Sequence, residues 1–509
     1  MTAKLRILLY GPQMYPIPKA PTSVELIPME PGSPLPPEKV PGSQQEIQIY
    51  DLVILCAHAF PADLAYLRPR VRAYTVFYTD PAMREPPLLE EFLAEKMAEF
   101  LPYSELPSFL EEAPEIYHAR DYGAILPLGA AVPAKGSDTL SVTVRGNDAI
   151  TYQGVFGQEP VPILTHLYNI TLQKDTEVEL FQEYRCDPSV SLSLRIYETY
   201  AGNAKTEGTR YDFPLKEHPV IRFRAHYPKS ILYLSVLATG HGNTLLGCLH
   251  QRDAHRGRYL FLPGGKRLCS GRGEETFWYY SPGDRKPPLC IYFSGYRTRE
   301  GFEGLNMMSK LHCPFLLFQD PRIEGGCFYL GDADYEGNIV SVIRQAADSL
   351  HFRDEQMVFS GISMGSTGAL YYASFFHPGA VLLGKPLINI GQIACNERTI
   401  RPGGFPTSLD AVLHLTGTAD PEHAAMLDQK MWQRIDAAHF EGTEFAISYM
   451  KDDDYDPTAY PDFLRHMAGR KIKIYGKGNP GRHNDDTAAI VNWFEIRLRH
   501  ILQEDFERK

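Results

Sequence analysis

The sequence predicts an α/β fold, and two patterns carry that prediction. From about residue 269 onward, short apolar segments typical of buried parallel strands alternate with longer segments of helical periodicity. Within this part of the chain, Gly361-Ile-Ser-Met-Gly365 has the form G-x-S-x-G and follows one of those apolar segments. A buried strand, a sharp turn at a serine and a helix, in that order, are typical of the α/β-hydrolase fold.

The residues on either side of this pentapeptide support the same prediction. Residues 357–359 form an apolar strand, and the run of small residues from 366 to 373 favours a helix. Upstream, residues 338–350 place Ile, Val, Ala and Leu at spacings of one, three and four, which indicates an amphipathic helix. We therefore predict that Ser363 stands above the sheet as a nucleophile, with a glycine on each side that allows close backbone packing.

Residues 1–133 are predicted to form an open α/β unit of Rossmann-like type. Three buried parallel strands are expected at 5–10, 51–56 and 72–78. An amphipathic helix is expected at 87–101, and the many prolines of residues 12–41 indicate a long irregular loop. Gly11-Pro12 after the first strand is not a phosphate-binding glycine motif, so nucleotide binding is unsupported there.

Residues 134–268 change to the period of two that is typical of half-buried strands. Strands are expected at 140–144, 177–181, 191–197, 221–224 and 231–237. The pattern predicts a β-sandwich that is inserted into the hydrolase domain or precedes it. Such domains often bind sugars through aromatic side chains, so carbohydrate binding is an expectation by analogy with the fold.

Residues 269–509 are predicted to form the α/β-hydrolase catalytic domain. Its strands are expected at 288–293, 314–318, 357–359, 380–383, 445–450 and 471–475. A final amphipathic helix is expected from Thr487 onward. The order of strands and helices fits the doubly wound sheet of a hydrolase.

Composition excludes several classes of function. The 509 residues are 44% hydrophobic and 22% charged, and the formal net charge of −11 argues against a nucleic-acid partner. The eight cysteines include no CxxC pair and no HExxH motif occurs, so no metal site is expected. The N-terminal segment lacks the form of a signal peptide, and no apolar run reaches the roughly 18 residues of a membrane span. We therefore expect a cytoplasmic protein with reduced cysteines.

A nucleophilic serine requires a histidine base, which in this fold follows the last strand. His483 has that position, because it comes after the strand expected at 471–475 and before the final helix. His466 and His500 are later in the chain as well, but both have the pattern of helix-surface residues. The glycines of 476–481 spell G-x-G-x-x-G, a pattern that also occurs in dinucleotide-binding sites. Such a site belongs early in a βαβ unit, whereas this segment lies near the C-terminus. We therefore interpret it as the loop that carries His483.

The acid that orients the histidine is expected after the strand at 445–450. Four carboxylates compete there, at Asp452, Asp453, Asp454 and Asp456. The sequence alone does not choose among them. We select Asp453, at the centre of the run, with Asp454 as the alternative.

An oxyanion hole needs two backbone N–H groups that point at the developing negative charge. One is expected from Met364, the residue after the nucleophile. The other is expected from Gly295 or Tyr296, in the loop that follows the first parallel strand of the hydrolase domain.

Several longer strings resemble a known family. They are Pro287-Pro-Leu-Cys-Ile-Tyr-Phe-Ser-Gly-Tyr-Arg297, Glu300-Gly-Phe-Glu-Gly304, Asp320-Pro-Arg-Ile-Glu-Gly-Gly326, Ser360-Gly-Ile-Ser-Met-Gly365, Gly384-Lys-Pro-Leu387 and Arg401-Pro-Gly-Gly-Phe-Pro-Thr-Ser-Leu-Asp410. They are similar to the second of the accessory Sec proteins, which serve the export of serine-rich-repeat adhesins in Gram-positive bacteria. The resemblance is dense from about 250 to 495.

The resemblance implies a cytoplasmic component of an export complex, either free of the membrane or peripheral to it through that complex. Two sister accessory Sec proteins, the accessory SecA motor and the glycosylated adhesin would be its partners. It also implies O-acetylation of the adhesin's N-acetylglucosamine residues. Carried across, Ser363 would be the nucleophile, His483 the base and one acid of 452–454 its orienting partner; members of the family vary between Asp and Glu at the acid.

Three functions remain open at this point. The first is a sugar O-acetyltransferase, the second is a chaperone or scaffold subunit of the export complex without catalysis, and the third is a serine esterase. We predict that the first two roles coexist. No coenzyme motif is present, so no bound cofactor is expected and the acyl donor stays unassigned.

Overall fold

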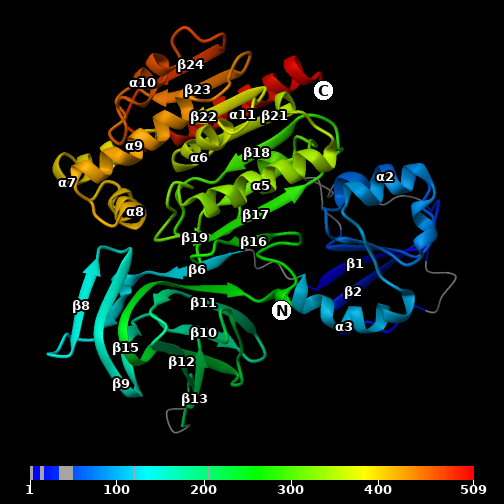
Figure 1. The fold of residues 1–509 in the computed structure, drawn as a ribbon. Helices are drawn as coiled ribbons and strands as arrows, with labels where there is room; N and C mark the ends of the chain where they lie inside the picture. Colours follow the sequence, from blue (N-terminus) through cyan, green and yellow to red (C-terminus); the bar gives the residue numbers. More distant parts are fainter. Residues whose placement is uncertain (1–3, 12–16, 34–49, 118–121, 203–206, 509) are drawn as a thin grey trace.

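The computed structural model describes residues 4–11, 17–33, 50–117, 122–202 and 207–508. Its described strands form three sheets, and helices pack mainly against the first and the third (Figure 1). The protein is thus of the mixed α/β class that the sequence predicts. In the part of the chain that the structure describes, no helix has both the length and the apolar character needed to traverse a bilayer.

The first sheet is parallel, with the strand order β2-β1-β3-β4-β5. Its strands are β1 (Leu5–Tyr10), β2 (Val24–Met29), β3 (Leu52–Leu55), β4 (Val76–Tyr78) and β5 (Glu99–Phe100). The accompanying helices are α1 (Pro61–Leu67), α2 (Pro87–Glu95) and α3 (Leu106–Ile116). Apolar residues on both faces of β1 and β3 are buried, which explains their continuous apolar sequence.

Two predictions for this first part of the chain are wrong in detail. The segment expected to be an irregular loop contains β2, whose Pro28 is tolerated because β2 lies at the edge of the sheet. Positions 12–16 and 34–41 of that segment lie outside the described residues. The helix expected to reach residue 101 ends at Glu95, since Met97 adopts a positive φ of 48° and Glu99 then starts β5.

The second sheet is antiparallel and curves around its own apolar core. Its strands are β6 (Gly123–Leu126), β7 (Ala131–Pro133), β8 (Leu140–Arg145), β9 (Ala149–His166), β10 (Ile170–Gln173), β11 (Glu177–Cys186), β12 (Val190–Tyr200), β13 (Thr209–Pro214), β14 (Ile221–Arg224), β15 (Lys229–Asp253) and β19 (Arg299–Glu300). β6 and β7 precede residue 134, and β19 returns from beyond residue 269. The sheet therefore includes strands from outside 134–268, and the division into domains at those residues stays a prediction.

The third sheet has the order β16-β17-β20-β18-β21-β22-β23-β24 and is parallel from β20 to β24. Its strands are β16 (Lys266–Cys269), β17 (Glu275–Ser281), β18 (Leu289–Phe293), β20 (Phe315–Gln319), β21 (Met357–Ile362), β22 (Ala380–Gly384), β23 (Glu444–Met450) and β24 (Lys473–Asn479). Its helices are α4 (Leu305–Ser309), α5 (Ala333–Leu350), α6 (Met364–Ala373), α7 (Ile390–Thr399), α8 (Thr407–Thr416), α9 (Pro421–Asp436), α10 (Ala459–His466) and α11 (Thr487–Phe506).

Helices cover both faces of this third sheet. Residues of α5 through α10 pack with one set of alternating strand residues, such as Ile291 and Phe359. Residues of α11 and α4 pack with the other set, such as Tyr292 and Val358. The expected loop at 476–481 is largely strand, because β24 extends to Asn479. The strand leads into the short connection that carries His483.

Candidate active site

Ser363 stands at the turn between β21 and α6, where the sequence places it. Its backbone has φ 55° and ψ −124°, a strained conformation that persists only where the surrounding structure imposes it. A Cβ on Gly361 would lie 2.2 Å from the carbonyl oxygen of Gly365, and a Cβ on Gly365 would lie 2.1 Å from that of Phe293. Gly361 is therefore required for the turn to close on itself, and Gly365 for the turn to fit against β18.

The structure brings Ser363, His483 and Asp453 into one hydrogen-bonded series. Ser363 Oγ lies 2.8 Å from His483 Nε2, and His483 Nδ1 lies 2.8 Å from Asp453 Oδ2. Because a carboxylate only accepts, Asp453 fixes the proton on Nδ1 and leaves Nε2 to accept the serine proton. His483 is 1% exposed, whereas Ser363 is part-exposed, so only the serine end of the series meets solvent.

The other carboxylates of the turn after β23 have different partners. Asp454 accepts from the backbone N–H of His483 at 3.0 Å and forms an ion pair with Arg401 at 2.6 Å. Asp452 accepts from the backbone N–H of Gly481. Asp456 is buried and accepts from the loop that begins α7. Asp453 alone of the four contacts the imidazole ring.

Aromatic side chains pack around the histidine. The Tyr455 ring stacks on the His483 ring, with centroids 4.4 Å apart. The Phe405 ring also stacks on Tyr455, with centroids 5.1 Å apart. Arg401 lies over the Tyr455 ring at 4.3 Å. Tyr296 meets Phe405 edge to face at 5.6 Å. This packing restricts the imidazole to the orientation that its hydrogen bonds require.

The three residues expected to form the oxyanion hole lie in or beside the turn, but not all of their backbone N–H groups are free to bind a substrate. In the described part of the chain, the N–H groups of Met364 and Tyr296 have no hydrogen-bond partner. The N–H of Gly295 donates to the Glu303 carboxylate at 2.7 Å. Gly295 is adjacent to the turn, because a Cβ there would lie 3.1 Å from the carbonyl oxygen of Ile362. The N–H groups of Met364 and Tyr296 can thus donate to a substrate oxygen, whereas the N–H of Gly295 is already bonded to Glu303.

A buried lysine near the site was not predicted. Lys385 is 4% exposed, follows β22 and donates through Nζ to Thr487 Oγ1 at 3.0 Å. Burial lowers its pKa, and the nearby carboxylates of Asp453 and Glu303 oppose that shift. Lys385, Glu303 and Arg401 all lie in strings that carry the family resemblance, which was the available signal for them.

The site has the groups for acyl transfer through a serine ester. It offers a serine, a base and an orienting carboxylate, and beside the turn two N–H groups that have no partner among the described residues. Among the described residues, no three His, Cys, Asp or Glu side chains are arranged to hold a metal ion.

Fold and site together define a mixed α/β protein with a Ser–His–Asp series at a strand-to-helix turn of a mainly parallel sheet. Residues 36–508 match the family described as the accessory Sec system GspB-transporter, and the chain belongs to this family. The resemblance inferred from the sequence is therefore confirmed.

Relatives cover most of the chain. An accessory Sec system protein of Streptococcus gordonii is 37% identical over 455 residues, which are 88% of either chain. One of Staphylococcus aureus (strain NCTC 8325 / PS 47) is 39% identical over 374 residues, covering 72% of this chain and 70% of the relative. A chain of the Glycosylation Associate Protein (Gap123) complex from Streptococcus agalactiae is 32% identical, covers 100% of both chains and superposes with a TM-score of 0.86.

Proposed function

We propose that this protein O-acetylates N-acetylglucosamine on a serine-rich-repeat glycoprotein and assists the export of that glycoprotein. The observation that carries the enzymatic part is the series Ser363 Oγ, His483 and Asp453, with both heavy-atom distances at 2.8 Å. Membership of the accessory Sec family supports the export part. The identity of the acceptor follows from the family resemblance.

In the first half-reaction, Ser363 Oγ attacks the carbonyl carbon of an acetyl donor while its proton passes to His483 Nε2. The N–H groups of Met364 and Tyr296 stabilise the negative oxygen of the tetrahedral intermediate. The intermediate collapses to an acetyl ester on Ser363, and the leaving group takes the proton from His483. Asp453 stabilises the imidazolium throughout without taking its proton.

In the second half-reaction, a sugar hydroxyl attacks the acetyl ester and gives its proton to His483 Nε2. Collapse of the second intermediate releases the O-acetyl sugar, and Ser363 Oγ recovers its proton from His483. Water in place of the sugar would produce acetate, so the outcome depends on acceptor binding and on exclusion of water. An esterase is therefore the alternative within the same chemistry.

We propose two sister accessory Sec proteins as partners, together with the accessory SecA motor and the glycosylated adhesin. The two sister proteins are supported as partners by the likeness to a chain of the Gap123 complex from Streptococcus agalactiae. The motor and the adhesin follow from the family resemblance alone. We propose that the protein lies in the cytoplasm, either free of the membrane or held at its surface by these partners.

Replacement of Ser363 by alanine in cells tests the proposal. We expect loss of acetyl groups from the adhesin glycans by mass spectrometry, with adhesin still exported. Ser341→Ala, on the exposed side of α5, serves as the control and should leave acetylation unchanged. Unchanged acetylation in the Ser363→Ala strain would refute the enzymatic role and leave a chaperone or scaffold subunit. Acetate release from a chromogenic acetyl ester, unaffected by glycan acceptors, would favour the esterase.

A further inference from the structure

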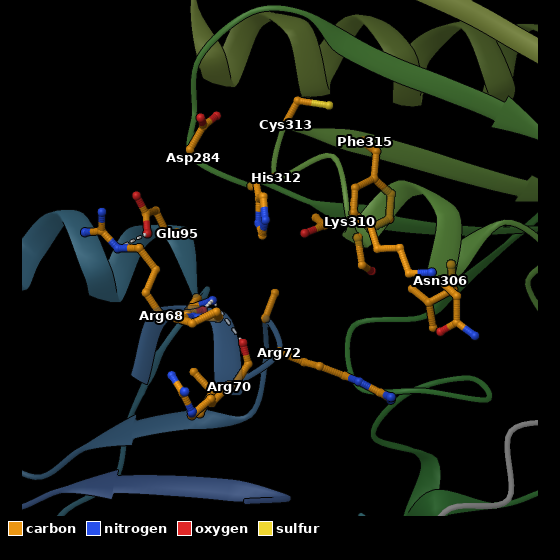
Figure 2. A pocket seen from close by; sticks show the side chains of 18 of the residues that line it. Arg68, Arg70, Arg72, Glu95, Asp284, Asn306, Lys310, His312, Cys313 and Phe315 are labelled. Atoms are coloured by element: carbon orange, nitrogen blue, oxygen red, sulfur yellow. Dashed lines mark hydrogen bonds and ion pairs between the residues drawn. The ribbon is translucent and has the colours of Figure 1, made fainter. Parts of the chain in front are cut away.

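A pocket lies between the first sheet's helices and the third sheet, away from Ser363. Its volume is about 640 Å³. On one side it is lined by residues 68–73 and by Glu95 and Lys96, and on the other by residues around the end of β17 and the start of β20 (Figure 2). The second side lies at the amino ends of the parallel strands, whereas Ser363 follows the carboxyl end of β21. The two sites therefore occupy opposite edges of the same sheet.

The pocket is fixed from both sides. Tyr74, just before β4, donates its hydroxyl to the carbonyl oxygen of Tyr280 on β17 at 2.9 Å. Its ring meets that of Tyr279 edge to face at 6.0 Å. These contacts hold the first sheet against the third, so the walls of the pocket form one structure rather than two independent surfaces.

Positive charge dominates the lining. The cationic residues are Arg68, Arg70, Arg72, Lys96 and Lys310, and the carboxylates are Glu95 and Asp284. Each carboxylate already has an arginine partner, because Glu95 pairs with Arg68 at 3.0 Å and Asp284 with Arg508 at 2.7 Å. In a chain whose formal net charge is −11, this local excess of cations is a distinct feature.

Two cations on facing walls lack a carboxylate partner. Among the described residues, neither Arg72 nor Lys310 forms an ion pair, and both are exposed to solvent at the pocket. Figure 2 shows Arg72 on the side of the first sheet and Lys310 on the opposite side. Burial raises the pKa of Tyr279 to about 12, and the positive charge of Arg72 opposes that rise.

Lys96 contributes a partly buried ammonium group to the wall formed by residues 68–73. Its Nζ donates to the carbonyl oxygens of Arg68 at 2.6 Å and Val71 at 2.9 Å. Burial lowers its pKa to about 8, because the charged form loses hydration. An anion in the pocket would compensate for that loss.

We propose that this pocket binds a phosphate-bearing ligand of about nucleotide size, with Arg72 and Lys310 as its principal contacts. A guanidinium on one wall and an ammonium group on the other match the several charged oxygens of a phosphate or diphosphate. The volume lies within the range of small-molecule sites and exceeds that of a single inorganic phosphate. The buried rings of Tyr279 and Phe315 add apolar lining for the organic part of the ligand.

A phosphate group attached to an organic part occurs in two kinds of ligand, a soluble nucleotide and an anionic lipid with its head group. Isothermal titration with pyrophosphate, ADP and UDP tests the first source, and flotation with phosphatidylglycerol vesicles against phosphatidylcholine vesicles tests the second. The test variant is Arg72→Glu with Lys310→Glu. The control is Lys174→Glu with Lys216→Glu, which makes the same change in net charge at exposed sites in the second sheet's loops.

We expect saturable binding of a diphosphate probe or of the anionic vesicles by the wild-type protein. The pocket variant should lose at least about tenfold in affinity, while the control variant stays within about twofold. Melting temperatures without ligand show whether each variant is folded. The proposal is overturned if the wild-type protein binds none of the probes, or if the pocket and control variants lose binding equally.

Discussion

At the level of single residues, the acidic turn after β23 offers the sharpest contrast. Asp453 and Asp454 are neighbours of the same type, and both bind His483, but they bind different groups of it. Asp453 accepts from the ring and Asp454 from the backbone N–H. The first contact sets the tautomer and charge of the base, whereas the second only positions the loop.

Asparagine substitutions separate these two roles. Asp453→Asn should lower kcat for acetyl-ester cleavage by about 10³–10⁴-fold, because the amide no longer stabilises the imidazolium or fixes its tautomer. Asp454→Asn should lower kcat by less than about tenfold, since an amide oxygen can still accept from the His483 N–H. Equal losses, measured by steady-state kinetics on folded variants, would contradict the assignment of Asp453.

Sequence reasoning reached Ser363, His483 and Asp453 because each follows a predictable strand in a known chain order. The choice of Asp453 over its neighbours had no physical support until the ring contact was visible. Arg401 lies in a string that carries the family resemblance, but its contact with Asp454 and the contact of Tyr455 with His483 could not be predicted, because they join loops that are far apart in the chain. Nor could the sequence show that Glu303 occupies the N–H of Gly295.

At the level of elements, the turn from β21 to α6 depends on space that only glycine leaves. The hypothetical Cβ of Gly365 meets a backbone oxygen of β18, which cannot move without disturbing the sheet. A Cβ on Gly337, in the second turn of α5, would meet nothing within 4 Å. The two positions form a matched pair of helical glycines with opposite expectations.

Gly365→Ala should destabilise the protein by at least about 2 kcal/mol, because of overpacking against a rigid neighbour. Gly337→Ala should stabilise it by about 0.5–1 kcal/mol, since alanine is the better helix former. Urea unfolding followed by circular dichroism measures both. An unchanged free energy of unfolding in Gly365→Ala would contradict the close contact between this turn and β18.

Elements with strong periodicity were predictable, and β1, β14 and α6 lie close to their expected bounds. β2 was missed because prolines dominate its surroundings and edge pairing tolerates them. The helices α7 to α9 were not predicted, and of α10 only a helical pattern around His466 was recognised, although these helices cover the sheet next to the site. Their sequences mix polar and apolar residues, so the tertiary contacts determine them more than local pattern does.

At the level of the whole molecule, the antiparallel sheet lies beside the third sheet (Figure 1). Buried charged side chains join the two. His414 of α8 lies 2.8 Å from Asp148, between β8 and β9, and 3.3 Å from Glu274 before β17. Burial alone would lower the pKa of His414, but these two carboxylates outweigh burial and raise it to about 9. Arg252 of β15 pairs with Glu275 of β17 at 2.5 Å in the same junction.

This junction predicts a loss of stability at alkaline pH. The pKa of His414 is higher in the folded protein than the roughly 6.5 of an unfolded chain, so its contribution is complete below that value and is lost as pH rises through about 9. We expect a loss on the order of 1–3 kcal/mol, seen as a fall in melting temperature between pH 6.5 and 9.5.

His414→Gln should flatten that fall, because the side chain no longer titrates. His439→Gln, at an exposed position in the loop before β23, is the control and should keep the wild-type dependence. A His414→Gln protein with the wild-type slope would argue against a charged histidine in the junction. The change of period in the sequence predicted an antiparallel sheet, but the contacts of His414 could not be predicted, since they pair residues more than 100 positions apart.

The central claim is that Ser363 carries the acetyl group. The most direct test is mass spectrometry of the purified protein, quenched with acid within seconds of mixing with a chromogenic acetyl ester. We predict one acetyl group on the peptide that contains Ser363, and none on that peptide in Ser363→Ala or His483→Ala protein. Ester cleavage that continues at the wild-type rate in Ser363→Ala, with no acetyl group on Ser363 in the wild-type protein, would contradict the account.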